Sequence, residues 1–232
     1  MSAPALSPPE SCDTASMPRP DSPTATWNPD AGVGSRGEPL LPPGRLFADR
    51  YEVRELLGTG GSAQVFRAWD RTLRREVALK VLRPETAGAN ARRRLAREAA
   101  LARDVESPHL LRVFDVGEAE GLAFLILELL PGGNLRDRLR SGPLPVGEAV
   151  EIGRQLLSGL AALHAARIVH RDIKPSNVLF TAAGEAKLGD LGVALPLAGD
   201  ETRATSMGAL LGTIDYLSPE QALGHEADER SD

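Results

Sequence analysis

The chain has 232 residues, of which 42% are hydrophobic, a length and composition that allow one large domain or two small ones. Its formal net charge of -5 argues against nucleic acid as the main partner, because neutralising phosphates requires a basic surface. The single cysteine, Cys12, excludes an intrachain disulfide and a cysteine-based zinc site, which fits a reducing compartment.

The first 45 residues are rich in proline and small residues. Ten of the 18 prolines fall within residues 1–43, and no helical or alternating apolar pattern is present there. We therefore predict a disordered Pro/Ser-rich arm over residues 1–45, with a partner-binding proline tract as the alternative. The N-terminus also lacks the pattern of a signal peptide, and the longest apolar run, LAFLILELL at 122–130, is only as long as a strand. We expect a cytoplasmic chain without a membrane segment.

From Tyr51 onward, short apolar runs alternate with turn signals. YEVRELLG, SAQVFRAWD and REVALKVL predict three antiparallel strands, separated by GTGG and DRT. A helix is predicted over 90–103, where Asn90 can cap the first turn. LLRVFDVGE and LAFLILELL predict two more strands. Residues 46–130 are thus expected to form a five-stranded sheet with one helix.

After PGG at 131–133 the apolar period becomes helical. Val150, Leu156, Leu157, Leu160 and Leu163 recur at steps of three or four residues, which predicts a buried helix over 146–164. Short strands are predicted at IVH, NVLF and AKLGD. Residues 131–232 are therefore expected to form a mainly helical second part, joined to the first by a hinge over 128–133.

The stretch HRDIKPSNVLF at 170–180 places three polar side chains, Asp172, Lys174 and Asn177, between apolar pairs. This pattern indicates a loop between two buried strands, and loops on a rigid scaffold often carry chemistry. The alternative for Asp172 is an aspartate that only forms a turn.

Two further features suggest phosphate binding. The glycine-rich turn GTGGSAQV at 58–65 runs into a strand pattern, and such a turn lets backbone N–H groups approach phosphates, although an ordinary hairpin turn is the alternative. Lys80 stands in the middle of an apolar strand, where a lysine needs a partner. Glu98 on the predicted helix is the natural candidate, and a solvated sheet edge is the alternative for Lys80.

Residues 51–232 resemble eukaryotic-type Ser/Thr protein kinases of the bacterial branch. The motifs that carry the resemblance occur in order: GTGGSAQV, VALK, Glu98, HRDIKPSN, DLG at 190–192 and GTIDYLSPE at 212–220. The resemblance implies an α+β, bilobal fold, with a five-stranded antiparallel N-lobe sheet over 46–130 and a mainly helical, incomplete C-lobe over 131–232. It implies transfer of the ATP γ-phosphoryl group to Ser or Thr hydroxyls of protein substrates. The alternative is a truncated, weakly active or inactive nucleotide-binding or interaction module.

The resemblance also implies catalytic and metal-binding roles. Asp172 accepts or orients the proton of the attacking hydroxyl, and Lys174 neutralises charge on the transferring phosphoryl group. Asn177 and Asp190 hold Mg²⁺, an ion that prefers oxygen ligands.

The same resemblance implies an ATP site. Lys80 contacts the α and β phosphates, and Glu98 orients Lys80. The implied nucleotide-binding residues form the glycine turn, the apolar sandwich around adenine and the hinge: Leu57, Gly58, Thr59, Gly60, Gly61, Ser62, Ala63, Val65, Ala78, Lys80, Leu127, Glu128, Leu130 and Leu179.

Regulation by phosphorylation is a further hypothesis. In kinases of this kind, the arginine at the position of Arg171 often pairs with a phosphorylated residue of the activation segment. Thr202, Thr205 and Ser206 lie in that segment, and we expect one or more of them to be autophosphorylated. A dimer is one arrangement in which this autophosphorylation could take place.

The chain departs from the family pattern at several positions. Ala63 replaces the third glycine, Leu191 replaces the Phe of DFG, Ser218 replaces the Ala of APE, and Ile214 stands where Pro is common. None of these changes removes a catalytic group. ERSD at 229–232 resembles the start of the central C-lobe helix, so we expect the helix over 146–164 to lack part of its cover.

Overall fold

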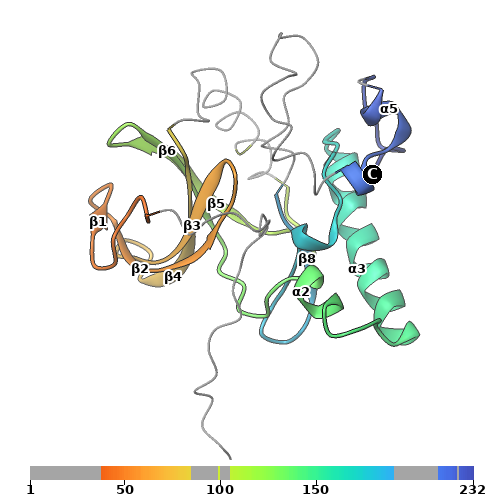
Figure 1. Cartoon of the computed structure of the whole chain (residues 1–232), viewed down its shortest axis with the longest axis horizontal. Coiled ribbons are helices and arrows are strands. Elements are labelled where there is room, and N and C mark those ends of the chain that lie inside the picture. The colour runs from red at the N-terminus through yellow and green to blue at the C-terminus, as the bar shows by residue number, and fades with distance from the viewer. Residues whose placement is uncertain (1–37, 85–98, 100–104, 191–213, 224) are drawn as a thin grey trace, which may run out of the picture.

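The computed structural model describes residues 38–84, 99, 105–190, 214–223 and 225–232 (Figure 1). They form an antiparallel sheet and, beside it, a second part that contains a long helix and a two-stranded sheet (Figure 1). This arrangement confirms the α+β, bilobal expectation. Within the described ranges, no helix combines the length and apolar character needed to span a membrane.

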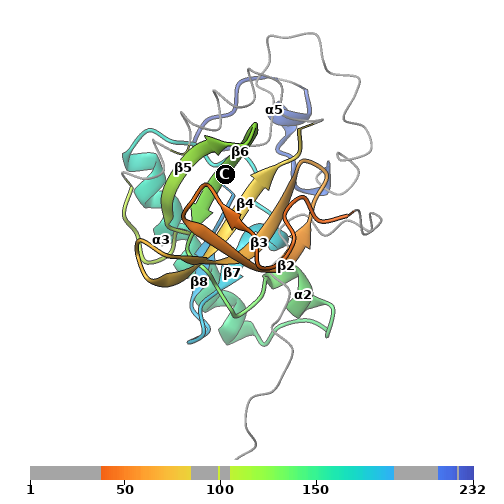
Figure 2. The ribbon, with the colours of Figure 1, turned by 90° about the vertical axis from the view of Figure 1, so that its left-hand side faces the viewer.

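The N-terminal sheet has six antiparallel strands in the order β1-β2-β3-β4-β6-β5. Figure 2 views the molecule from the side on which this sheet lies. Its strands are β1 (Leu46–Phe47), β2 (Tyr51–Thr59), β3 (Ala63–Asp70), β4 (Arg75–Leu82), β5 (Val113–Ala119) and β6 (Leu122–Leu127). The pairing register sets Lys80 of β4 between Val65 of β3 and Leu125 of β6. Lys80 is therefore in a central strand, and the solvated-edge alternative is wrong.

Side-chain alternation along the strands separates two buried clusters. Val65 and Ala78 point into a cluster that also contains Leu179 from the second part. Their neighbours Phe66 and Leu79 point into the opposite cluster, where Phe47 and Phe124 meet edge to face at 5.2 Å between ring centroids. The first cluster thus lies on the sheet face toward the second part.

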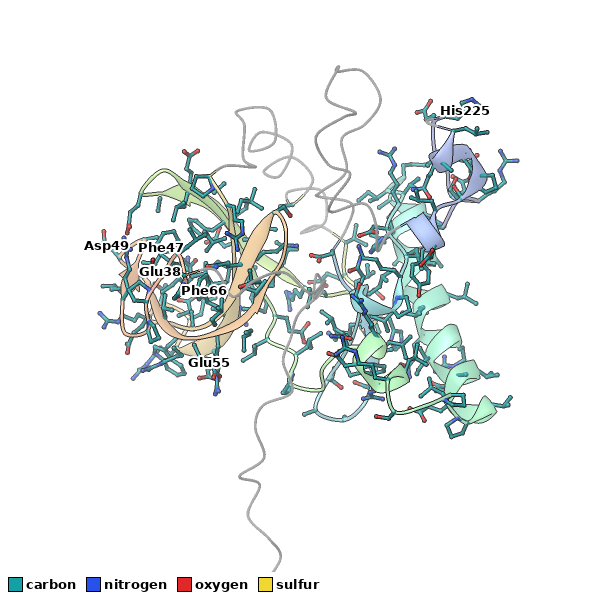
Figure 3. All side chains as sticks on the ribbon, in the orientation of Figure 1. Glu38, Phe47, Asp49, Glu55, Phe66 and His225 are labelled. Carbon is teal, nitrogen blue, oxygen red and sulfur yellow. The ribbon has the colours of Figure 1, made fainter. Side chains whose placement is uncertain are left out.

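Residues 38–45, which we assigned to the disordered arm, pack against the sheet. Leu41 and Phe47 are fully buried and belong to one cluster with Phe66, and Figure 3 labels both phenylalanines. The strand β1 pairs with the start of β2, so the expected five-stranded sheet gains a sixth strand. Residues 1–37 lie outside the described residues. The helix predicted over 90–103 also lies outside them, except for Ala99, which is helical and buried.

The second part contains the long helix α3 (Val146–Ala165), which confirms the prediction over 146–164. Its other elements are α2 (Leu135–Leu139), η1 (Pro175–Asn177), β7 (Val178–Phe180), β8 (Ala186–Leu188), η2 (Ile214–Tyr216) and α5 (Pro219–Ala222). Strands β7 and β8 confirm the strands predicted at NVLF and AKLGD, and they pair with each other in an antiparallel arrangement. The strand predicted at IVH is wrong, because residues 168–170 form no regular element.

One face of α3 packs against the rest of the chain. Leu163 is fully buried and Ile152 nearly so, and Gly159 allows a close approach, since a Cβ there would lie 2.8 Å from the His109 carbonyl oxygen. Val150 and Leu157, which we expected on the buried face, are 65% and 67% exposed.

The two parts meet along β8. Leu188 donates its N–H to the His109 carbonyl at 2.9 Å, and its own carbonyl accepts from the Leu111 N–H at 2.8 Å. Lys187 forms an ion pair with Glu128, which directly follows β6, at 2.8 Å. These contacts fix the end of β8, where Asp190 follows.

Candidate active site

The loop between α3 and β7 gathers the three polar side chains of the HRDIKPSN stretch. Lys174 Nζ lies 2.8 Å from Asp172 Oδ2, and Asn177 Nδ2 donates to the same oxygen at 2.8 Å. A second bond of 2.8 Å runs from Asn177 Nδ2 to the Asp172 backbone carbonyl. Pro175 begins the short helix η1, whose first position suits a residue without N–H. The Asp172 carboxylate is thus held in one orientation by a cation and an amide.

An ion pair joins the N-terminal sheet to this loop region. Lys80 Nζ of β4 lies 2.5 Å from Asp190 Oδ1, and the Lys80 side chain is 6% exposed. Such burial requires an opposite charge, which Asp190 supplies. Glu98, the partner that we predicted for Lys80, lies outside the described residues.

The Asn177 and Asp190 side chains have the donor chemistry for a hard cation. The Gly189 N–H donates to the Asn177 carbonyl at 2.8 Å, which ties the residue before Asp190 to Asn177. Because Nδ2 of Asn177 is used on Asp172, its Oδ1 is left buried, with no hydrogen-bond partner among the described residues. A buried amide oxygen without a donor and a nearby carboxylate fit Mg²⁺. Among the described residues, no group of three or more His, Cys, Asp and Glu side chains forms another metal site.

His170 links the loop to the segment before Asp190. Its Nε2 lies 2.8 Å from the Gly189 carbonyl oxygen, and the Asp172 N–H donates to Nδ1 at 3.2 Å. These partners require a proton on Nε2 and none on Nδ1, which is the neutral imidazole. Burial lowers the pKa of His170, against the hydrogen bond to Gly189, so the neutral form is favoured.

The backbone of the loop is anchored by a residue that the sequence did not point to. Both oxygens of Asp232 accept backbone bonds of 2.8 Å, one from the His170 N–H and the other from the Arg171 N–H. His164 Nε2 lies 2.9 Å from Asp232, whose side chain is fully buried. Residues 229–232, which resemble a helix start, are not helical here. No local pattern signals a contact that spans about 60 residues of chain.

The residues expected around adenine come together in one buried cluster. It contains Leu57, Val65, Ala78, Leu127, Leu130 and Leu179. At the hinge, the Glu128 N–H donates to the Arg112 carbonyl at 2.9 Å. Within the described ranges, neither the Glu128 carbonyl nor the Leu130 N–H has a backbone hydrogen-bond partner.

The glycine-rich turn connects β2 to β3, so it runs into a strand, as the sequence pattern predicted, and does not open a helix. Gly60 donates its N–H to the Ala63 carbonyl at 2.8 Å, which closes the turn. Gly58 and Thr59 end β2, Gly61 and Ser62 form the tip, and Ala63 begins β3. Thr202, Thr205 and Ser206 lie outside the described residues.

Comparisons with known proteins agree with this geometry. Residues 51–232 match the family described as protein kinase domain. The chain is 43% identical over 199 residues to serine/threonine-protein kinase pkn2 of Myxococcus xanthus, covering 83% of this chain and 24% of that protein. It is 39% identical over 191 residues to serine/threonine-protein kinase PrkC of Bacillus subtilis, covering 82% of this chain and 29% of PrkC. The chain therefore spans less than a third of the length of these relatives.

Among solved structures, the PknI kinase domain of Mycobacterium tuberculosis has the same fold. The TM-score is 0.67 at 28% identity, and the match covers 82% of this chain and 72% of that one.

Proposed function

Because this chain belongs to the protein kinase family, among relatives named as bacterial Ser/Thr kinases, we propose that it transfers the ATP γ-phosphoryl group to Ser or Thr hydroxyls of cytoplasmic proteins. The observation that carries the proposal is the Lys80–Asp190 ion pair of 2.5 Å, which joins the sheet to the region of the Asp172 loop. Phosphoryl transfer requires positioned charges more than covalent chemistry, and this arrangement supplies them.

Each residue of the loop has a role in this proposal. Asp172, oriented by Asn177, accepts or orients the proton of the attacking hydroxyl. Lys174 supplies positive charge at the same place. Asn177 Oδ1 and Asp190 would hold Mg²⁺, which when bound neutralises phosphate charge.

We propose that residues 46–130 form the N-lobe and residues 131–232 the C-lobe. The nucleotide would bind between these two lobes. The buried cluster around Val65, Ala78 and Leu179 offers an apolar site for adenine. Lys80 would turn from Asp190 toward the α and β phosphates, and Glu98 would orient it. The backbone of the glycine turn would cover the phosphates.

Arg171 supports regulation by phosphorylation. Its Nε is buried and has no hydrogen-bond partner among the described residues, a cost that a phosphate oxygen would relieve. We propose that Thr202, Thr205 or Ser206 supplies this phosphate by autophosphorylation, within a dimer. Mass spectrometry of active protein that finds no phosphate between Asp190 and Glu220 would contradict this part.

The experiment that tests the function is incubation with γ-labelled ATP, Mg²⁺ and a generic Ser/Thr protein substrate. Wild type is compared with Asp190→Asn, which removes the carboxylate while keeping the side-chain shape, and with Asp228→Asn, an exposed carboxylate outside the site. Label in wild type and Asp228→Asn but not in Asp190→Asn supports the kinase. Nucleotide binding without label in all three proteins contradicts it and favours a binding module.

A further inference from the structure

The short helix α5 connects to the catalytic loop through one side chain. Gln221 Nε2 donates to the Arg171 backbone carbonyl at 2.7 Å. The other end of the same amide, Oε1, accepts from the Ser218 N–H at 3.1 Å and lies 3.1 Å from Ser218 Oγ. The amide cannot be reversed, because Nε2 would then face an N–H donor and Oε1 would face a carbonyl oxygen.

Arg171, the residue that Gln221 contacts, has an unusual backbone conformation. Its φ of 68° lies in the left-handed region, which is unfavourable for a residue with a side chain. Such a conformation persists only where the surroundings hold it. Here Asp232 accepts from the Arg171 N–H at 2.8 Å, and Gln221 donates to the Arg171 carbonyl at 2.7 Å. The two side chains therefore hold both peptide groups of the residue directly before Asp172.

We propose that Gln221 is a positioning residue for phosphoryl transfer, which fixes the Arg171–Asp172 peptide group and thereby the direction of the Asp172 carboxylate. The inference rests on the proposed function, since it assigns Asp172 its role there. Gln221 also couples α5 to the loop, so a displacement of α5 would be passed to Asp172.

The chemistry of Gln221 separates this role from helix capping. Ser218 and Gln221 form a capping box, in which a glutamate serves as well as a glutamine because only the acceptor is used. The bond to Arg171 needs a donor, which a carboxylate lacks at neutral pH. Gln221→Glu therefore keeps the cap and removes the link, whereas Ser218→Ala weakens the cap and leaves the link in place.

The first test compares the kinetics of these two variants with wild type in the full chain. Loss of one hydrogen bond corresponds to about a three- to tenfold effect, and we expect kcat to fall by about tenfold in Gln221→Glu. The KM for ATP should not change, because Gln221 does not line the proposed nucleotide site. Ser218→Ala should keep its kcat within about twofold, a margin below the effect of one hydrogen bond. An unchanged kcat in Gln221→Glu, or an equal fall in both variants, overturns the proposal.

A second readout does not need activity. Hydrogen exchange of the amides of His170, Arg171 and Asp172 should accelerate by at least about threefold in Gln221→Glu but not in Ser218→Ala, because the free energy of local opening falls. Equal exchange in all three proteins overturns the inference, even if wild type phosphorylates its substrate. Faster exchange in Gln221→Glu with no activity in wild type supports the positioning contact and contradicts the proposed function instead.

Discussion

The imidazole of His170 joins the Asp172 loop to the segment after β8 through its two ring nitrogens. Nε2 faces the Gly189 carbonyl at 2.8 Å, and Nδ1 faces the Asp172 N–H at 3.2 Å. A proton added to Nδ1 would face another N–H and break that contact. The ring can therefore make both contacts only while it is neutral. Burial lowers the pKa of His170, which also favours the neutral form.

This gives a pH prediction for stability. Since the folded state holds His170 neutral, the unfolded state binds one proton more below the ordinary histidine pKa of about 6.5. The free energy of unfolding should therefore fall as pH drops from about 6.5 toward 5, by up to about 1.4 kcal/mol per pH unit for this group. Above about pH 6.5, the contribution of His170 to the free energy of unfolding should not change with pH. Urea unfolding of wild type and His170→Gln at several pH values measures the difference. Gln can still donate to Gly189, and equal pH slopes in both proteins would contradict the prediction.

At the residue scale, sequence motifs identify chemical groups but not the contacts that hold them. Asp172, Lys174 and Asn177 could be predicted because they lie within six residues of one another. Asp232 and Gln221 could not, because their bonds to Arg171 span 61 and 50 residues. Such contacts follow from tertiary packing, which no local pattern encodes.

The helix α3 shows how far periodicity predicts an element. Its bounds follow from the helical spacing of apolar residues, but the spacing cannot tell which apolar residues are covered. Leu163 is fully buried, whereas Leu157 is 67% exposed on the same helix. Two leucines in one helix therefore offer a matched test.

We expect Leu163→Ala to lower the free energy of unfolding by about 2–5 kcal/mol, because it removes buried methyl groups and leaves a cavity. Leu157→Ala should change it by less than about 0.5 kcal/mol, since the side chain is mostly in water and alanine favours helix. Chemical denaturation of both variants checks the prediction. Similar losses in the two variants would show that the Leu157 face is covered in solution.

The elements that the sequence missed are short or depend on their neighbours. The strand β1 has two residues, and α2 has five, fewer than an isolated helix needs. The apolar run IVH reads as a strand, but the Ile168 N–H instead donates to the Leu163 carbonyl at 2.9 Å and completes the exit from α3. At IVH, packing therefore overrode the local strand propensity.

The segment over 38–45 depends on Gln64, the residue after Ala63 in β3. Gln64 is fully buried, and its Oε1 accepts from the Leu40 N–H at 2.7 Å while its Nε2 donates to the Glu38 carbonyl at 3.3 Å. A chain that begins at residue 46 would leave this amide without partners and expose the site of Leu41. The segment thus supports the strand that carries the glycine turn.

We expect a chain without residues 1–45 to be less stable than one without residues 1–37 by about 2–4 kcal/mol. The loss combines burial of one leucine with the cost of an unsatisfied buried amide. Urea unfolding of the two truncated proteins measures it. Because both lack the same 37 residues, equal stability would mean that the segment packs only weakly in solution.

For the whole molecule, the Lys80–Asp190 pair joins the two parts through groups that a nucleotide would engage. The relation of the parts was predictable only through the family resemblance, because contacts between a strand and a loop 110 residues apart leave no local signal. If Asn177 and Asp190 hold Mg²⁺ with ATP, ligand binding must stabilise the folded state in which the two parts meet at this ion pair. Stability in the presence of ligand then reports on the site without any measurement of turnover.

We expect ATP with Mg²⁺ at about 100 times its Kd to stabilise wild type by about 2.7 kcal/mol, a rise in Tm of roughly 5–10 °C for a domain of this size. Chelation of Mg²⁺ by EDTA should remove most of the rise. In Asp190→Asn the Mg²⁺-dependent part should be lost, while a smaller rise with ATP alone remains, because the apolar cluster around Leu179 is intact. Thermal unfolding of each protein with and without ligand gives these increments, which are compared within each protein because the variant also lacks the Lys80 ion pair. An Asp190→Asn protein that keeps the full Mg²⁺-dependent rise would contradict the metal-binding role of Asp190.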